Sequence, residues 1–532
     1  ALELAAGWLR VYDCAEIVRE IERSIEFLAT ELHDVPPRQR SVYVTWQHTW
    51  ELLTTAMQRA LADLALFRGP FKLEAALAVA EASVVDLAAL LDAALIQRRA
   101  NGWYEIHSLI RQLALQQAAA QQHLVAASAA AERRHSHYHL AWLAAREPEL
   151  VGPEPHLAVA QIRRRLDDLR QAWRLASQRS WTADLASSLD GLARFYDSSG
   201  LVQEAIQLLD WTAERLQTVE GDDGAGLHSR VLTWLAHFLD RNGQIDAAFE
   251  RLHHALALAG QGEDAGARWE ATSLLGALLP HRGQFDLAQR CLAEASAAFR
   301  DRDDRRRLAV ALTRLGIAQW RHGDYGAAQA SLHEARGLQE GLHNRLGLAK
   351  ILRTLGGIAF EQKRLDQALA YATQARQIYE DVGDQASMAM LDGNLALLSR
   401  EQGRYAEALA YNQNDLDYAA ATGDRPGAAV ALGNRGSILW DAGRLDEALD
   451  CFARAQRLAE EVGDAWETAR HLAAAAMVRA VGHQRQQALA DLLTAIPALR
   501  SRGAPFYLVG PLLDAAELLI DAGELAAARA LV

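Results

Sequence analysis

A repeat of forty residues sets the strongest limit on how this chain can fold. Nine alanines recur with one step of 43 residues followed by seven steps of 40. They are Ala205, Ala248, Ala288, Ala328, Ala368, Ala408, Ala448, Ala488 and Ala528. A fixed period of roughly 20 to 50 residues is typical of repeat arrays, in which each unit packs only on its neighbours. We therefore expect an extended array and not one globular core.

Each repeat is expected to contain two helices. A glycine stands five residues before most of these alanines, and Lys363 and His483 stand at the exceptions. The glycines are Gly200, Gly243, Gly283, Gly323, Gly403, Gly443 and Gly523. Glycine adopts positive φ at little cost and so ends a helix. Half a period later, Gly383-Asp384 predicts a second turn, at which Asp caps the next helix. Small residues in the first helix, such as Gly436, would let the paired helices approach closely.

The composition favours an all-α, cytoplasmic protein. Half of the residues are apolar, 23% are charged and only 11 are proline, which is a helix-forming mixture. The net charge of −13 argues against nucleic acid as a partner, because affinity for phosphates depends on Lys and Arg. Cys14, Cys291 and Cys451 lack the spacing of a disulfide or metal site. No apolar run is long enough for a membrane span and there is no leader, so no membrane partner is expected. We expect both ends to be cuts in a longer chain.

The repeat resembles the tetratricopeptide repeat (TPR). The resemblance lies in the small residue of the first helix, the turn glycine, and then Ala448, Phe452 and Ala455 in the second helix. It extends over residues 182–532, although the period is 40 residues whereas the usual TPR has about 34. Longer helices of this kind occur in kinesin light chains and bacterial signalling ATPases. The resemblance implies an all-α fold, a right-handed TPR-like α-solenoid of about nine 40-residue helical pairs.

Residues 41–120 predict a different module. Four short helices are expected at 44–53, 56–67, 73–82 and 85–94. Between residues 95 and 106, alternating residues surround Asn101-Gly102, the dipeptide most typical of a β-hairpin. This order, in which helices precede a hairpin, is typical of a winged-helix domain. DNA binding is not expected, because the helix at the recognition position has Asp86 and Asp92 but no basic residue.

The first 181 residues resemble the end of an NB-ARC-type signalling ATPase of the STAND class. Residues 1–6 resemble the tail of its Gly-Leu-Pro-Leu-Ala-Leu helix. Residues 67–71 and 104–111 resemble its winged helix, and residues 134–138, 149–153 and 165–173 resemble its helical connector. The resemblance implies a bacterial protein with a tail of the nucleotide-binding module in residues 1–40, a winged-helix domain in 41–120, a helical connector in 121–181 and the solenoid in 182–532.

The same resemblance assigns a role to one histidine. In the family, a Met-His-Asp motif closes the winged helix, and its His contacts the β-phosphate of bound ADP. His107 matches the His, whereas Ile106 and Ser108 replace Met and Asp. This implies a nucleotide latch at His107 in the full-length parent, with ATP or ADP as its cofactor; a packed or surface His is the alternative. No cofactor is expected in residues 1–532, because they contain no phosphate-binding loop.

Other candidate chemistry is sparse. His135, His137 and His139 suggest a metal site, because His135 and His139 share a helix face. No third ligand at a fitting spacing is apparent, so we expect a solvated helix surface and no metal. No Ser-His-Asp, Cys-His or paired-carboxylate arrangement stands out. We therefore expect no catalytic residue and no enzyme activity from these residues.

The TPR resemblance also predicts a binding groove. In that family the first helix of each pair lines the concave face, and the residue two before the small position points into the groove. Steps of 40 place Arg314, Thr354, Asn394 and Asn434 there. Nearby charged and aromatic residues complete the predicted surface: Trp320, Lys350, Arg353, Phe360 and Trp440. Asn can bond to a peptide backbone and Arg to a carboxylate. Alternatively, Asn394 and Asn434 join adjacent repeats.

Together these features predict the sensing and autoregulatory part of a STAND-type signal-transduction regulator. A protein, a peptide or a small inducer would bind in the groove and relieve autoinhibition of the ATPase, and the full-length protein could oligomerise on activation. Two alternatives stay open. The repeats alone would suffice for a scaffold that assembles protein complexes without nucleotide control, and an enzyme could arise from a hidden site or from the intact ATPase polypeptide.

Overall fold

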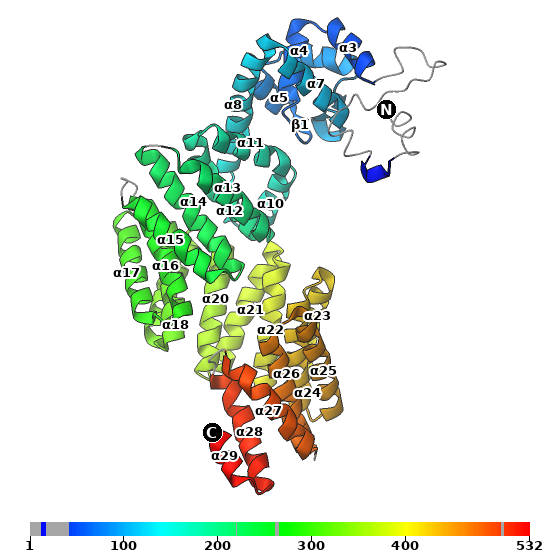
Figure 1. Cartoon of the computed structure of the whole chain (residues 1–532). Coiled ribbons are helices and arrows are strands. Elements are labelled where there is room, and N and C mark those ends of the chain that lie inside the picture. Colours follow the sequence, from blue (N-terminus) through cyan, green and yellow to red (C-terminus); the bar gives the residue numbers. More distant parts are fainter. Residues whose placement is uncertain are drawn as a thin grey trace. The chain divides into compact units, whose positions relative to one another are not determined.

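The computed structural model describes residues 12–16, 42–219, 221–260, 265–482, 484–501 and 505–531 (Figure 1). The predicted tail in residues 1–40 lies almost wholly outside this part of the chain, as does the turn residue His483. The chain divides into two compact units. The first comprises residues 1–150 and 154–282, and the second comprises residues 151–153 and 283–532. The division at residue 282 falls inside the repeats.

Five helices form most of the N-terminal part of the first unit. They are α3 (Val42–Leu52), α4 (Thr55–Leu64), α5 (Leu73–Ala80), α6 (Val84–Asp92) and α7 (Ser108–Ala120). The first four match the predicted helices, with ends that differ by at most three residues. Local chemistry sets the start of α6, where the Ser83 hydroxyl accepts from the Asp86 N–H and the Asp86 carboxylate accepts from the Ser83 N–H. This reciprocal cap satisfies two backbone donors at once.

The predicted hairpin is present and gains a third strand. β2 (Gln97–Arg98) and β3 (Trp103–Glu105) pair antiparallel, and the turn between them has φ of +61° at Asn101 and +74° at Gly102. β1 (Phe71–Lys72) pairs antiparallel with the other edge of β3, so the order is β1-β3-β2. An isolated hairpin is marginally stable in water. The third strand therefore ties the hairpin to the segment just before α5.

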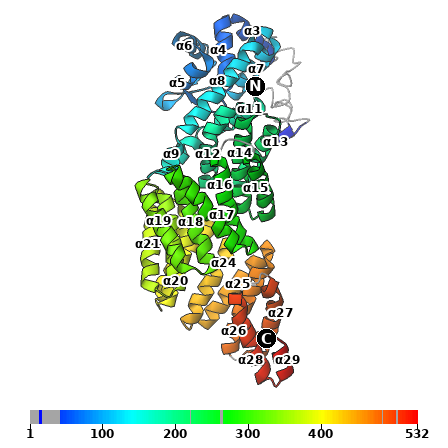
Figure 2. The same ribbon diagram turned by 90° about the vertical axis from the view of Figure 1, so that its left-hand side faces the viewer.

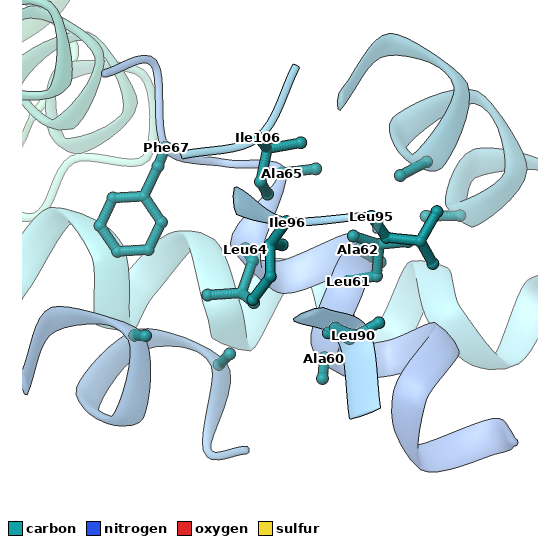
Figure 3. Close-up of a cluster of buried hydrophobic side chains, with 14 of the residues drawn as sticks. Ala60, Leu61, Ala62, Leu64, Ala65, Phe67, Leu90, Leu95, Ile96 and Ile106 are labelled. Atoms are coloured by element: carbon teal, nitrogen blue, oxygen red, sulfur yellow. The ribbon is translucent and has the colours of Figure 1, made fainter. Parts of the chain in front are cut away.

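Apolar side chains from these elements share one core. Figure 3 shows Leu61 and Leu64 of α4 gathered with Leu90 of α6 and Ile96 next to β2. All four are at most 1% exposed. Complete burial of a Leu or Ile side chain contributes about 1.5–3 kcal/mol. Side chains of α3 and α7 join the same cluster, which makes residues 42–120 a packed module.

Four helices occupy the predicted connector: α8 (Gln122–Ala144), α9 (Glu147–Leu150), α10 (Pro155–Arg163) and α11 (Leu166–Gln178). α8 packs against both α5 and α11. Arg134 of α8 pairs with the buried Asp63 of α4 at 3.1 Å. The fully buried Trp173 of α11 donates its indole N–H to the Thr212 hydroxyl of the first repeat at 2.9 Å. The connector is therefore packed on the module before it and on the repeats after it.

The helices that follow the connector belong to the repeats. In the first unit they are α12 (Thr182–Ser199), α13 (Val202–Leu216), α14 (Asp222–Arg241), α15 (Ile245–Ala259) and α16 (Ala265–Leu278), which the 3₁₀ helix η5 (Leu279–Arg282) continues. In the second unit they are α17 (Phe285–Asp301), α18 (Arg305–His322), α19 (Tyr325–Gly341), α20 (Arg345–Glu361), α21 (Leu365–Val382), α22 (Gln385–Glu401), α23 (Tyr405–Thr422), α24 (Arg425–Asp441), α25 (Leu445–Val462), α26 (Ala465–Val481), α27 (Arg485–Ser501), α28 (Pro505–Asp521) and α29 (Leu525–Leu531).

Helices that follow one another in the second unit, such as α18 to α21, pack side by side (Figure 2). The all-α, TPR-like solenoid is thus confirmed, with three short strands as the β-structure of the described residues. None of the described helices combines the length and the hydropathy of a membrane span.

The predicted turn residues adopt the conformations that end and start helices. Every predicted turn glycine has positive φ, and Lys363 adopts the same left-handed conformation with φ of +59°. At the second turn, Asp384, Asp424 and Asp464 each accept a hydrogen bond from a backbone N–H in the first turn of the following helix. The two-turn pattern read from the sequence is therefore confirmed.

Small residues bring the two helices of a pair together. A Cβ added at Gly316 would lie 2.6 Å from Leu332, and one added at Gly436 would lie 2.8 Å from Phe452. Ala328 and Ala448, which define the repeat, are 0% exposed. Because protein interiors are close-packed, larger side chains at these positions would separate the helices or force strain.

Candidate ligand-binding pocket

Three helices of the second unit enclose a pocket of about 340 Å³. α22 and α24 are the first helices of successive pairs and supply most of the wall, and α23 supplies the rest. Asn394 of α22 and Asn434 of α24, which the 40-residue step predicted as binding residues, both line the pocket. Its volume lies at the small end of the range typical of ligand sites, roughly 300–1,000 Å³. It would hold one or two side chains of a larger partner.

The two asparagine side chains are available for a ligand. Asn394 is exposed and Asn434 is half-buried. Within the part of the chain that the structure describes, neither amide makes a side-chain hydrogen bond. An amide carries two donor hydrogens and one acceptor oxygen, which together match the N–H and C=O groups of a peptide. In the described residues, no side-chain hydrogen bond of these two amides joins adjacent repeats.

A carboxylate that the sequence did not single out lies in the same pocket. Asp415 of α23 is half-buried, and its Oδ2 would be 3.1 Å from a Cβ added at Gly393. Burial, together with the negative charges of Asp392 and Asp424, raises the pKa of Asp415 to about 6. No ion pair to Asp415 is found among the described residues. The pocket therefore contains an anionic group that lacks a cationic partner.

The two neighbouring acids are already engaged. Asp392 is fully buried and pairs with Arg376, whose Nε lies 2.5 Å from its Oδ1. Its Oδ2 also accepts from the Asn414 amide at 3.2 Å. Asp424 caps α24 by accepting from the Gly427 N–H at 3.0 Å. Asp415 is thus the carboxylate of this group that can pair with a ligand.

An apolar rim accompanies the polar groups. Met390 of α22 and Val430 of α24 are 44% and 39% exposed, and both line the pocket with Leu397 and Tyr418. Exposed apolar side chains beside hydrogen-bonding groups are typical of surfaces that bind another molecule. The pocket can therefore hold the methylene stem of a side chain as well as its polar end.

Four other predicted binding residues lie on the first helices of earlier pairs. Arg314 and Trp320 are half-buried on α18, and the Trp320 indole N–H donates to Glu361 at 2.9 Å. On α20, Lys350 is exposed and Arg353 contacts the Met390 sulfur at 3.6 Å. Arg353 therefore lies close to the pocket, whereas the Trp320 ring packs on Gly357.

Two predicted aromatic residues are half-buried outside the pocket wall. Phe360 lies at the end of α20 with the Lys363 ammonium 5.5 Å from its ring centre. Trp440 lies at the end of α24 and packs on the apolar cluster that contains Phe452. Both contribute to packing within the solenoid.

Thr354 requires a correction. Its side chain is 4% exposed, and its hydroxyl donates to the Lys350 carbonyl of the same helix at 2.9 Å. A threonine can bond to its own helix in this way because its side chain is short. The 40-residue phase brings Asn394 and Asn434 into one pocket, but at Thr354 the short side chain stays below the surface.

His107 has a local role in the structure. It is the N-cap residue of α7, and its Nδ1 accepts from the Leu109 N–H at 3.2 Å. The ring is exposed. Capping satisfies one of the N–H groups that a helix start leaves unpaired. A nucleotide contact by His107 stays a prediction for the full-length parent.

The prediction of a solvated histidine surface on α8 is wrong for two of the three residues. His135 and His139 are 0% and 2% exposed, whereas the His137 side chain is 65% exposed and bonds to Asp184 at 2.8 Å. His135 and His139 face inward because α11 covers that side of α8. Sequence spacing gave no sign of this packing.

A larger cavity of about 530 Å³ lies in the first unit, beside α11. Arg68, Arg111, Arg170 and Arg174 line it. Arg170 makes two bonds of 2.5 Å to Glu204, and Arg111 donates to the backbone carbonyls of Phe67 and Arg68, whereas the pocket in the second unit contains two of the predicted residues. We therefore place the candidate site in the second unit.

Residues 384–461 match the tetratricopeptide repeat family. The match covers every residue of the pocket among α22, α23 and α24. This part of the chain is thus a tetratricopeptide repeat segment. No curated protein sequence matches the chain.

Several solved structures resemble the chain. One is a STAND protein with a tetratricopeptide repeat sensor from Pyrococcus horikoshii, with 15% identity, a TM-score of 0.47, and coverage of 86% of this chain and 72% of that protein. A Rap protein in complex with Competence and Sporulation Factor has 13% identity, a TM-score of 0.48, and coverage of 69% and 99%. The quorum sensor NprR from B. thuringiensis has 12% identity, a TM-score of 0.46, and coverage of 63% and 97%. Likenesses of this degree assign no function to the chain.

Proposed function

We propose that the chain is the sensing part of a STAND-type signal-transduction regulator and that it binds a protein or peptide at the pocket among α22, α23 and α24. The observation that carries the binding proposal is the combination of Asn394, Asn434 and the unpaired Asp415 in one pocket. The amides would bond to the partner's backbone, and the carboxylate would pair with a Lys or Arg side chain of the partner. Repeat solenoids commonly bind partners along such surfaces.

The STAND part of the proposal is supported by the order of modules in the sequence. In this proposal, residues 41–120 are the winged-helix domain and residues 121–181 connect it to the sensor. ATP or ADP would bind to the preceding part of a bacterial, cytoplasmic parent protein, and ligand binding would release that part for oligomerisation. The packed connector supports coupling, because α8 contacts the N-terminal module through Arg134 and Asp63.

Binding can be tested with synthetic ten-residue peptides that carry a central Arg, Lys, Glu or Ala. We expect the chain to bind peptides with Arg or Lys more tightly than those with Glu or Ala. The double variant Asn394→Ala and Asn434→Ala should weaken this binding by about tenfold or more, since each lost hydrogen bond contributes about 0.5–1.5 kcal/mol. Gln377→Ala is a matched control, because Gln377 is an exposed amide on α21 that bonds to Asp381. Equal affinity for all four peptides would contradict the proposed charge preference.

Nucleotide control separates the regulator from the scaffold alternative. In the full-length parent, His107→Ala removes both the imidazole and the cap of α7, whereas His107→Asn can keep a cap. If His107 is an off-state latch, both variants should raise basal signalling at equal protein level. Unchanged signalling in both variants would favour the scaffold. An increase with Ala alone would assign His107 to capping.

A further inference from the structure

Three side chains that can bind a metal ion meet in the interior of the first unit. His135 and His139 stand one helical turn apart on α8, and Asp168 lies in the first turn of α11. Their exposed fractions are 0%, 2% and 2%. One ligand atom from each residue lies within 4.8 Å of the other two, and His135 Nε2 is 3.6 Å from Asp168 Oδ1.

The two imidazoles lack hydrogen-bond partners in the part of the chain that the structure describes. None of their four ring nitrogens lies within 3.5 Å of a hydrogen-bond partner there, and His135 Nε2 faces Asp168 Oδ1 at 3.6 Å. The Phe67 ring packs against both imidazoles, with ring centres 5.4 Å from His135 and 5.7 Å from His139, so this neighbour offers them no polar atom. Burial of an unpaired polar group costs free energy, and native interiors usually pair such groups. Two adjacent buried histidines in this state can still act as ligands.

A backbone contact fixes the orientation of the Asp168 carboxylate. The Arg68 N–H donates to Asp168 Oδ1 at 2.6 Å and orients the carboxylate. Such outer contacts are typical of metal sites.

We propose that His135, His139 and Asp168 form a binding site for a divalent transition-metal ion of the Zn²⁺ type. Imidazole and carboxylate ligands suit Zn²⁺. Bond lengths of about 2.0–2.2 Å in a tetrahedral site place ligand atoms roughly 3.3–3.6 Å apart, which agrees with the distance between His135 and Asp168. The fourth position would be taken by water or by the second carboxylate oxygen. Arg111 and Arg165 bring positive charge nearby, so the ion depends on the negative charge of Asp168.

The ion would join two helices of the first unit, next to a third segment. His135 and His139 belong to α8, Asp168 belongs to α11, and Arg68 lies between α4 and β1. A metal at this point would hold α8 and α11 together, and the hydrogen bond from the Arg68 N–H to Asp168 would tie this pair to the N-terminal module. Its role would be structural, because the ligands are fully buried and offer no open face to a substrate.

The test uses the whole chain without an affinity tag, after treatment with a chelator. Zn²⁺ binding is measured by calorimetry and by thermal melting, and the visible spectrum of bound Co²⁺ reports a tetrahedral site. We expect one Zn²⁺ per chain and a rise in melting temperature. His139→Leu and Asp168→Asn should each weaken Zn²⁺ binding by at least about tenfold, a loss reported even for outer contacts of metal sites. His137→Ala is the control, because His137 lies on the same helix but its side chain is 65% exposed.

Two outcomes would overturn the proposal. One is the absence of stoichiometric Zn²⁺ binding by the wild-type chain at micromolar concentrations, which leaves a buried His-Asp cluster. The other is Zn²⁺ binding that His139→Leu and Asp168→Asn leave unchanged, which assigns the ion to surface histidines. If a variant fails to fold, the wild-type titration and the His137→Ala control still decide between these results.

Discussion

The connector around α8 and α11 places its polar groups differently from the pocket among α22, α23 and α24. In the connector, Arg134 reaches Asp63, which is 71 positions away, and Trp173 reaches Thr212, which is 39 positions away. In the pocket, Asn394 and Asn434 are related by one step of the repeat. Periodicity therefore predicts which residues of the repeats share a surface, whereas it predicts none of the contacts in the connector.

The largest expected effect compares the loss of one tryptophan in the connector with the loss of one tryptophan in the pocket helices. Trp173→Ala removes a fully buried ring and its hydrogen bond, so it should lower the free energy of unfolding by about 4 kcal/mol. Trp440→Ala removes a half-buried ring at the end of α24 and should cost about 1 kcal/mol. Urea unfolding followed by circular dichroism measures both. Equal losses of the free energy of unfolding in the two variants would contradict the difference that we describe between the two regions.

A second prediction concerns two glycines of one helical pair. Gly316→Ala should lower the free energy of unfolding by about 1–3 kcal/mol, because the new Cβ would lie 2.6 Å from Leu332. Gly337→Ala on α19 should instead raise it by about 0.4–1 kcal/mol, because no atom lies within 4 Å and Ala favours the helix. Thermal melting checks both signs. A loss at both positions would show that helix spacing is not what selects glycine at 316.

The third prediction uses the pH dependence of Asp415. Its pKa is about 6 in the folded chain, whereas the usual value of 3.8 applies to the unfolded chain. Between pH 4 and 6 the folded chain therefore retains a proton that the unfolded chain has released. Asp415 therefore lowers stability as pH rises through this window. Asp415→Asn should raise the free energy of unfolding by about 1 kcal/mol at pH 8, and the gain should vanish towards pH 4.

Asp392→Asn is the contrasting variant. Asp392 is buried and paired with Arg376, so its loss should be destabilising by about 2 kcal/mol at pH 8. Denaturant unfolding at several pH values distinguishes the two aspartates. If Asp415→Asn is destabilising at pH 8, Asp415 has a structural partner and cannot be the free anion of the pocket. Affinity for an Arg-containing peptide should also fall from pH 7.5 to 5, as Asp415 takes up a proton.

The smallest expected effect on stability belongs to the two asparagines. The double variant Asn394→Ala and Asn434→Ala should change the free energy of unfolding by less than about 0.5 kcal/mol, as is usual for surface substitutions. Thermal melting beside the Gln377→Ala control measures the change. A loss above about 1.5 kcal/mol would show that these residues join adjacent repeats.

The sequence was most informative where one rule applied repeatedly. Turn glycines, capping aspartates and buried alanines recur every 40 residues, and the structure has helices and turns where these residues predict them. The same phase brought Asn394 and Asn434 into one pocket. The prediction was wrong at Thr354. The position in the repeat predicts towards which side a side chain points, but it does not predict how far the side chain reaches or how deeply its neighbours bury it.

Contacts between residues that the 40-residue repeat does not relate could be identified only from the tertiary structure. Asp415 and Asp392 are both acids on neighbouring helices, but only the packing shows that Arg376 neutralises Asp392 and that Asp415 lacks a partner among the described residues. His135 and His139 were visible as a pair on one helix face, but Asp168 joins them only because α11 folds onto α8. Helix periodicity is a local property that the sequence determines by itself, whereas burial and ligand geometry depend on which distant segments pack together.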